Sequence, residues 1–411
     1  MAAVEKIGIG VVGSGTISYT YLSTLTSMIG AAEIIGCSDL IPERAERNAA
    51  LFGCKAMTND EIYECDDIQI VLNLTNVWSH YEVTKAALEH GKHVYSEKMA
   101  AENFFRAKEL YDLAQEKGVM FCMAPDTFLG GGYQTCRYLI DRGEIGMPFA
   151  ADAKIVRNYG TAGPKTPHGN VFVAGGTIPF DMGGYYIHAL QNMFGPVKRV
   201  AGFARYLKKE FTNPANPDWG GELIIDGPNC VAGTLEHWSG VYSQLIACDS
   251  GYMPGSEEPG IIVYGTGGTL FCPDPNTFGG PVKLLKPGYR DWVEVPMTHG
   301  FNGMEAFPEA YKADPRGNDF WFTSRRGVGP ADMCWALVND RPARITNEMG
   351  LHTIELIHAM EECCKTGQVY EMTTKPIRPA ALRPHFMGMD REAVFNDKWD
   401  ETVDTEPWWC K

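Results

Sequence analysis

Three side chains have the types to move a proton at a hydroxyl group. Lys98, preceded by Glu97, follows the apolar run 92–96, and Asp181 stands four residues before Tyr185, so a helix would place these two on one face. Free Lys and Tyr titrate near pH 10. A lysine cation would lower the pKa of the phenol, whereas Asp181 favours the charged lysine. We predict that Lys98, Asp181 and Tyr185 form a catalytic set in which Lys98 and Tyr185 share the proton, and either can be the formal base.

A glycine-rich turn near the N-terminus has the pattern of a dinucleotide site. The apolar run 6–12 leads into Gly13-Ser-Gly15-Thr-Ile-Ser18. The first glycine permits a tight turn, the second lets backbone approach a pyrophosphate, and the helix start that follows offers N–H groups to that anion. Serine replaces the third small residue, usually Gly or Ala. The expected cofactor contacts in this turn are Gly13, Gly15, Thr16 and Ile17.

Asp39 determines which cofactor is expected. It closes the second apolar run, 32–38, at a spacing close to the roughly 20 residues typical of an acid that binds the ribose diol. A carboxylate there repels a 2′-phosphate and favours NAD, while Arg44 is near enough to accommodate a phosphate. The alternative is an ordinary glycine turn followed by a strand-terminal acid. The order of strand, turn, helix, strand and acid argues against this alternative.

The elements that must position these groups divide the chain. Over 1–124 apolar strands alternate with helices, which predicts a doubly wound parallel Rossmann sheet with Lys98 at the carboxyl end of a strand, where such sheets bind ligands. Residues 125–370 predict an α+β domain with a mostly antiparallel open sheet, because β-rich segments follow one another directly. Residues 371–411 form a Pro-rich, aromatic C-terminal arm. Expected strands include 32–38, 68–74, 92–96 and 119–123, and expected helices include 42–52, 81–89, 104–117 and 183–193.

Composition narrows the classes of protein. The chain has 411 residues, 45% hydrophobic and 21% charged, which suits two well-packed domains. A net charge of -15 argues against nucleic acid and anionic membranes as partners. With no long apolar run and no signal-peptide pattern, we expect a cytoplasmic protein. The twelve cysteines are scattered, which predicts reduced thiols, and no cluster has metal-ligand spacing, so no metal is expected.

Several motifs occur in an order that resembles one enzyme family. Thr75-Asn-Val-Trp-Ser-His80 precedes Gly91-Lys-His-Val-Tyr-Ser-Glu97-Lys98, and Gly175-Gly-Thr-Ile-Pro-Phe-Asp181-Met-Gly-Gly-Tyr185 follows. Shorter matches lie at 124–130, 265–270 and 326–333. Up to about residue 382 the chain resembles the glucose–fructose oxidoreductase / inositol dehydrogenase (Gfo/Idh/MocA) family. The resemblance implies further contacts with NAD from Asn76, His80, Glu97 and Lys98.

Two positions depart from the family pattern. Met99 follows Lys98 where the family usually has proline after a cis bond. A cis bond to a non-proline residue costs about 2.5–4 kcal/mol, so we expect a trans bond here. Tyr185 stands where histidine is common in the family. Members that resemble glucose–fructose oxidoreductase and dihydrodiol dehydrogenase also have tyrosine at this position.

The expected function is NAD-dependent oxidation of a secondary ring hydroxyl in a sugar, glycoside or cyclitol. We favour C3 of a glucoside, because Tyr185 and segment 124–130 resemble a glycoside-handling branch. One alternative is a glycosidase of the same fold that acts by transient oxidation and elimination. Another is a non-catalytic dinucleotide- or sugar-binding regulator, against which the intact Lys98 argues. The open sheet is expected to join copies of the chain into a homo-oligomer. Candidate substrate contacts are Trp78, Tyr159, His168 and His188. Simple packing is the commoner role for the first three, and His188 could equally be structural.

Overall fold

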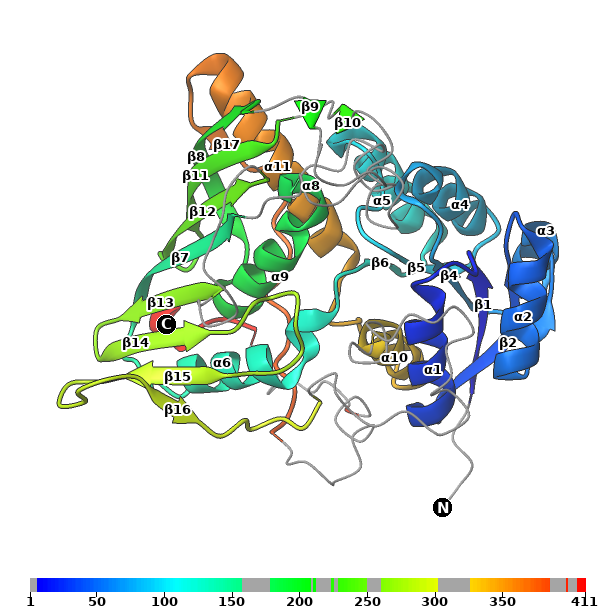
Figure 1. Cartoon of the computed structure of the whole chain (residues 1–411), viewed down its shortest axis with the longest axis horizontal. Helices are drawn as coiled ribbons and strands as arrows, with labels where there is room; N and C mark the ends of the chain where they lie inside the picture. The colour runs from blue at the N-terminus through cyan, green and yellow to red at the C-terminus, as the bar shows by residue number, and fades with distance from the viewer. Residues whose placement is uncertain are drawn as a thin grey trace.

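The computed structural model describes residues 6–156, 178–207, 210–211, 223–224, 228–249, 260–301, 326–384, 397 and 405–411. Two sheets lie on opposite sides of the molecule, with a layer of helices between them (Figure 1). The N-terminal sheet, on the right of that view, forms the Rossmann domain. The larger sheet on the left belongs to the second domain.

The Rossmann sheet is parallel throughout, in the order β3-β2-β1-β4-β5-β6. Every residue of β1 and β4 is buried, as expected for strands covered by helices on both faces. The strands are β1 Ile7–Val12, β2 Ala32–Ser38, β3 Lys55–Ala56, β4 Ile70–Asn73, β5 His93–Ser96 and β6 Phe121–Met123. The helices are α1 Ser18–Met28, α2 Pro42–Phe52, α3 Asn59–Glu64, α4 Val77–Glu89 and α5 Phe104–Lys117.

Local signals set the helix boundaries in this domain. Pro42 opens α2, and Gly53 and Gly118 end α2 and α5 in the left-handed conformation. The predicted bounds of β2, α2 and α5 are therefore confirmed. We did not predict β3 or α3, although Thr58 and Glu61 form a capping box at the start of α3 that marks it in the sequence.

The second domain has a nine-stranded sheet in the order β16-β15-β14-β13-β7-β12-β11-β8-β17. Within the described strands of this sheet β7 and β12 pair in parallel and the other neighbours antiparallel, so the expectation of a mostly antiparallel sheet is confirmed. Its strands are β7 Pro148–Val156, β8 Val197–Arg205, β11 Cys230–His237, β12 Tyr242–Cys248, β13 Ile261–Gly265, β14 Gly268–Cys272, β15 Val282–Leu285, β16 Val293–Val295 and β17 Tyr370–Glu371. A separate short pair joins β9 Glu210–Phe211 and β10 Leu223–Ile224.

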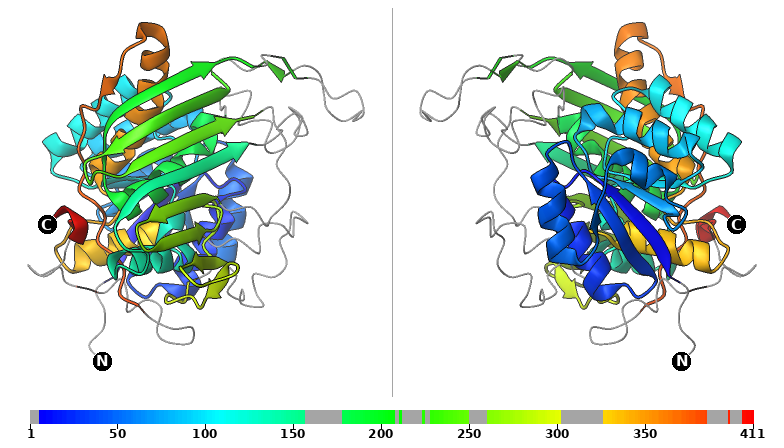
Figure 2. Two further views of the ribbon diagram at one scale, coloured as in Figure 1. Left: turned by 90° about the vertical axis from the view of Figure 1, so that its left-hand side faces the viewer. Right: turned by 90° about the vertical axis from the view of Figure 1, so that its right-hand side faces the viewer.

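One face of this sheet packs on helices and the other does not. The helices after β6 are α6 Gly131–Asp141, α8 Ile178–Asp181, α9 Gly183–Phe194, α10 Val328–Val338 and α11 Asn347–Thr366, with short 3-10 turns η1 Thr127–Leu129 and η7 Trp408–Cys410, and of these α6, α8 and α11 contact the sheet directly. Burial alternates along β8, and Phe203 on its outer side is 74% exposed. No described helix covers that outer face, which the left-hand view of Figure 2 shows directly.

Helix α11 joins the two domains. It packs against α5 and β6 of the Rossmann domain and against α9 and β8 of the second domain. At its start the Asn347 side chain pairs with the open edge of the Rossmann sheet. Its Oδ1 accepts from the Phe121 N–H at 2.8 Å, and its Nδ2 donates to the Val119 carbonyl at 3.2 Å. Helix α10 contacts β1, so a second segment from the C-terminal part of the chain also packs on the Rossmann domain.

A buried ion cluster ties the C-terminal arm to α10. Arg344 pairs with Asp332 and with Asp397, each at 2.5 Å, and Arg341 pairs with Asp332 at 2.8 Å. All four side chains are buried. At the end of the arm, the Trp408 indole N–H donates to the Ile140 carbonyl of α6 at 3.1 Å. The described part of the arm therefore lies on its own chain.

Candidate active site

Lys98 and Asp181 come from different domains and meet. Lys98 follows β5 at the carboxyl edge of the Rossmann sheet, and Asp181 is the last residue of α8. The Lys98 ammonium donates to the Asp181 backbone carbonyl at 2.9 Å and forms an ion pair with its carboxylate. Each side chain is 15% exposed. The site is therefore built across the joint between the domains.

The peptide bond between Lys98 and Met99 is cis, so our expectation of a trans bond was wrong. The groups beside this bond have partners that the sequence did not reveal. The Met99 carbonyl lies 2.8 Å from His80 Nδ1, and the Lys98 N–H donates to the Glu97 carboxylate at 3.1 Å. These contacts fix the backbone on both sides of Lys98.

Tyr185, in the first turn of α9, lies beside the lysine. Its ring centroid is 5.4 Å from the Lys98 ammonium, and the residue is 5% exposed. Within the described residues the Tyr185 hydroxyl has no hydrogen-bond partner. An otherwise buried phenol with an unengaged hydroxyl next to a cation is suited to exchange a proton with a bound alcohol.

Burial and neighbouring charges act differently on the two groups. Burial alone would lower the pKa of Lys98, but attraction to Asp181, Tyr185 and Glu97 raises it above its usual value. Lys98 is therefore a fixed cation at neutral pH. Burial raises the pKa of Tyr185, against the opposing effect of Arg326 and Lys98. Lys98 lowers the pKa of the phenol, as expected, but desolvation outweighs both cations, so the pKa of Tyr185 lies above its usual value.

Sequence reasoning missed a second cation at this site. The guanidinium carbon of Arg326 lies 5.3 Å from the Tyr185 ring centroid, and the side chain donates to the Asn276 amide oxygen at 3.0 Å. Arg326 opens the 326–333 motif, which was the available signal. Behind it, Glu97 accepts from the Tyr21 hydroxyl at 2.7 Å.

The glycine turn has the shape that a bound dinucleotide requires. Gly13 has φ +100°, and a Cβ there would lie 2.6 Å from the Leu74 backbone. A Cβ on Gly15 would meet nothing within 4 Å, so open space faces the turn at the start of α1. The Ser18 hydroxyl donates to the Gly15 carbonyl at 2.6 Å and fixes the turn. The residues present fit the pyrophosphate of a nicotinamide dinucleotide, NAD or NADP.

Asp39 is held at the end of β2. Its carboxylate accepts from the Ser14 N–H at 2.8 Å and from the Ile41 N–H at 2.9 Å, and lies 3.8 Å from the Arg44 guanidinium. Leu40 beside it is 91% exposed. The acid thus fastens the glycine turn to β2, next to an apolar side chain turned to solvent.

Comparison with known proteins places the chain in a family. Residues 7–124 match the model for the oxidoreductase family with an NAD-binding Rossmann fold, and residues 133–271 match the GFO/IDH/MocA C-terminal domain. Together the two matches span more than half of the sequence. The chain belongs to the GFO/IDH/MocA oxidoreductase family.

Individual relatives of this GFO/IDH/MocA chain are distant. Inositol 2-dehydrogenase/D-chiro-inositol 3-dehydrogenase of Lactiplantibacillus plantarum is 26% identical over 175 residues, which are 40% of this chain and 47% of that protein. The scyllo-inositol 2-dehydrogenase (NAD(+)) of Bacillus subtilis is 23% identical over 211 residues, 50% of this chain and 60% of that one. The matched regions span about half the length of these relatives.

Solved structures share the fold of this GFO/IDH/MocA chain. A levoglucosan dehydrogenase in complex with NADH and levoglucosan superposes with a TM-score of 0.71 and 16% identity, over 90% of this chain and 100% of that chain. An NAD binding oxidoreductase from Klebsiella pneumoniae gives 0.69 and 19%, over 89% and 98%. At these identities the likeness shows the fold alone.

The residues at the start of α4 have separate positions. Asn76 and Trp78 are exposed, whereas His80 is buried with Nδ1 at the Met99 carbonyl and Nε2 3.0 Å from the Thr75 carbonyl. Burial lowers the pKa of His80 despite both carbonyls. His80 thus fastens the segment that carries Lys98. Contact of Asn76 and His80 with NAD, and of Trp78 with substrate, stays a prediction.

Three further substrate candidates were expected in the second domain. Tyr159 and His168 lie outside the described residues. His188 is fully buried on α9, with Nδ1 3.0 Å from the Pro125 carbonyl, and burial lowers its pKa to about 4. It is therefore neutral at pH 7. Over the described ranges no three His, Cys, Asp or Glu side chains are grouped to hold a metal ion, and none of the described helices has the length and apolar composition to cross a membrane.

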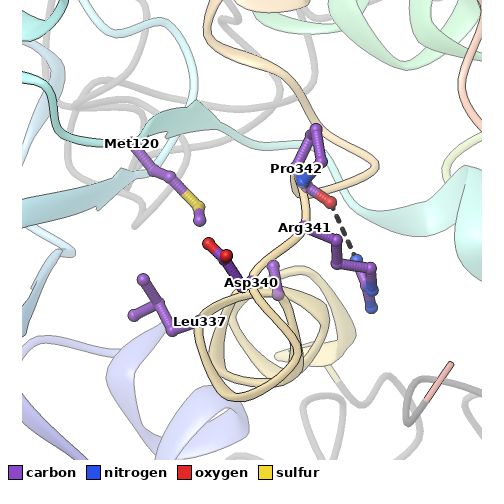
Figure 3. Close-up of a pocket in the computed structure, with 6 residues that line it drawn as sticks. Met120, Leu337, Asp340, Arg341 and Pro342 are labelled. Carbon is purple, nitrogen blue, oxygen red and sulfur yellow. Dashed lines mark hydrogen bonds between the residues drawn. The ribbon is translucent and has the colours of Figure 1, made fainter. Parts of the chain in front are cut away.

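An open pocket of about 330 Å³ lies elsewhere on the molecule (Figure 3). Its lining comes from the start of β6 and the end of α10, as Met120, Ala336, Leu337, Asp340, Arg341 and Pro342. Met120 precedes β6, whereas Lys98 follows the parallel neighbour β5. The pocket is thus at the amino edge of the sheet, opposite the candidate active site.

The two glycines of the turn are expected to respond differently to substitution. Gly13→Ala should lower the melting temperature, because Gly13 has positive φ and its Cβ would strike the Leu74 backbone. Gly15→Val should leave melting nearly unchanged and weaken NAD binding, because its side chain enters the open space. Thermal melting and NAD titration of both variants test this. Full NAD affinity in Gly15→Val would contradict the placement of the pyrophosphate.

Proposed function

We propose that this chain is an NAD-dependent dehydrogenase that oxidises a secondary ring hydroxyl of a sugar, cyclitol or glycoside. The observation that carries the proposal is the meeting of Lys98 with Asp181 and Tyr185 at the carboxyl edge of the Rossmann sheet. Ligands of such sheets bind at that edge. A fixed cation, and a phenol whose hydroxyl has no hydrogen-bond partner in the described part of the chain, are groups that alcohol oxidation can use.

The side chains have distinct parts in the proposed reaction. NAD, when bound, accepts the hydride. The Lys98 ammonium, held by Asp181, stabilises negative charge as it develops on the alcohol oxygen. Tyr185 in its phenolate form takes the alcohol proton, and no hydrogen-bond partner within the described residues competes for its oxygen. Lys98 and Tyr185 thus handle the proton together, and Asp181 keeps the lysine charged and in place.

The substrate class is supported by relatives rather than by the site itself. The curated relatives named above are inositol dehydrogenases, and the levoglucosan dehydrogenase shares the fold. We propose C3 as the carbon oxidised, since Tyr185 and segment 124–130 resemble a glycoside-handling branch.

A product-based experiment tests this function. Purified protein is incubated with NAD and a panel of cyclitols, free sugars and glycosides, and any keto product is identified with its carbon position. A keto product with equimolar NADH supports the dehydrogenase. Release of aglycone without net NADH indicates the glycosidase alternative, and tight NAD binding without any product indicates a regulator.

Cofactor preference is a separate proposal that follows from Asp39. The carboxylate at the end of β2 should bind the adenosine ribose diol, so NAD is expected to bind more tightly than NADP. Asp39→Ala should narrow that difference, whereas Glu43→Ala, an exposed acid in the first turn of α2, should not. Titration of each variant with both cofactors measures the effect. Equal affinities of the unmutated protein for NAD and NADP would contradict this role of Asp39.

We also propose that the outer face of the nine-stranded sheet binds a second copy of the chain. Phe203 of β8 and Tyr242 of β12 are exposed on it. Phe203→Glu should reduce the molar mass measured by light scattering, whereas Phe105→Glu, an equally exposed aromatic residue on α5, should not. A monomeric unmutated protein would contradict the proposal.

A further inference from the structure

We propose that Arg326 is a positioning residue for proton transfer, which favours negative charge on the Tyr185 oxygen against the cost of burial and so helps Tyr185 to exchange the proton. The inference rests on the proposed dehydrogenase function. Two cations lie close to the Tyr185 ring: the Arg326 guanidinium carbon is 5.3 Å from its centroid and the Lys98 ammonium 5.4 Å. A phenolate near two cations is stabilised over a neutral phenol.

The two cations differ in how far their charge is already paired. Lys98 forms an ion pair with the Asp181 carboxylate. Within the described residues Arg326 has no carboxylate within 4 Å, and its hydrogen-bond partner there is the neutral amide of Asn276. An unpaired cation exerts more net attraction on a nearby anion than a paired one. Consistently, Arg326 lowers the pKa of Tyr185 more than Lys98 does, although burial dominates the net shift.

Two segments hold Arg326 in place. Asp126, just before η1, accepts from the Gly327 N–H at 2.9 Å and the Gly329 N–H at 3.0 Å, which fixes the backbone next to Arg326. Asn276, between β14 and β15, orients the guanidinium. Arg326 itself is 7% exposed at the start of α10. A buried arginine held in this way is suited to act on one neighbour.

Other charged groups complete the surroundings of Tyr185. Glu97 after β5 and Asp181 at the end of α8 oppose a phenolate, and Arg326 and Lys98 favour it. Tyr185, Glu97, Tyr21 and Asp126 act on Arg326 and keep it charged although it is buried. Arg326 is therefore the cation whose loss should be felt most by the Tyr185 oxygen.

The chemical step balances with Tyr185 as its proton acceptor. The hydroxyl proton of the substrate moves to the phenolate oxygen of Tyr185. The hydrogen on the carbon that bears this hydroxyl moves as a hydride to NAD⁺. The alcohol becomes a ketone, NAD⁺ becomes NADH, and the neutral phenol loses its proton to water before the next turnover. Arg326 takes no proton and touches no substrate in this scheme.

The titration of Tyr185 can be measured without turnover. Protein labelled with ¹³Cζ-tyrosine is titrated by NMR without NAD, and Tyr185→Phe assigns the resonance. In Arg326→Gln the titration midpoint should move up by about one unit or more, and in Arg326→Lys it should stay near the unmutated value. Asn276→Asp should also raise it, because a carboxylate then pairs with the guanidinium while Arg326 stays in place. This last variant keeps the test valid if Arg326→Gln does not fold.

An unchanged midpoint in folded Arg326→Gln, or in Asn276→Asp, overturns the inference, whether or not the chain is a dehydrogenase. If a substrate is found, the rising limb of kcat/KM for oxidation should shift to higher pH by the same amount. A uniform loss of rate without that shift would show a structural role only. Absence of any keto product instead overturns the dehydrogenase proposal, whatever the midpoint.

Discussion

Lys98→Ala is expected to lower kcat by about 100- to 10,000-fold, the usual worth of a group that assists proton transfer. The ammonium favours the alkoxide-like transition state over the neutral alcohol, so its loss acts mainly on the chemical step. NAD affinity should be nearly unchanged, because the pyrophosphate contacts come from the glycine turn. Stopped-flow rates and NAD titration give the two quantities.

The variant also leaves the Asp181 carboxylate without its cation, so folding must be checked. Lys98→Ala with Asp181→Asn removes both charges and should melt closer to the unmutated protein while remaining slow. Lys85→Ala, which removes a partly exposed lysine paired with Glu109, should keep full activity. A folded Lys98→Ala that binds NAD and turns over at near-normal rate would overturn the catalytic assignment.

Tyr185→Phe should lose rate as well. If Lys98 and Tyr185 act as one unit, the double variant should lose less than the product of the two single losses. Multiplicative losses would show instead that the two side chains act independently.

Arg344→Met is expected to reduce the free energy of unfolding by about 3–5 kcal/mol, as is usual when one partner of a buried ion pair is removed. Its guanidinium is fully buried and pairs with Asp332 and Asp397, so both carboxylates would lose a cation. Equilibrium unfolding in urea measures the change. Lys108→Met, which breaks the exposed pair with Asp112, should cost far less. Equal effects of the two substitutions would refute the buried cluster.

The stability that this buried ion cluster contributes should depend on pH. Burial alone would raise the pKa of Asp332, but Arg344 and Arg341 hold it below its usual value. A carboxyl group with a depressed native pKa adds stability above its unfolded pKa, and loses it as acid protonates the native state. The stability difference between Arg344→Met and the unmutated protein should therefore shrink as the pH falls below about 4.

The Rossmann domain was predictable because its signals are local. Pro42, Gly53 and Gly118 mark helix ends by their own backbone preferences, and Lys98 follows an apolar strand. Arg326 was missed because its place beside Tyr185 depends on the packing of segments far apart in the chain. The cis bond at Met99 opposed the residue's own preference, and the contact with His80 at that carbonyl is not encoded in spacing. Helix α11 has an ordinary amphipathic sequence, and only its packing shows that it serves both domains.

The side chain of Asn347 on the edge of β6 has a consequence for protein synthesis. Asn347 and Phe121 are 226 residues apart, so at about 5–20 residues per second the ribosome needs roughly 11 to 45 s to make the segment between them. During that time the finished Rossmann sheet has an uncovered edge strand, which other chains can pair with. The newly made N-terminal half is therefore the stage at which this protein most needs chaperones, and a fragment that ends near residue 124 is expected to aggregate.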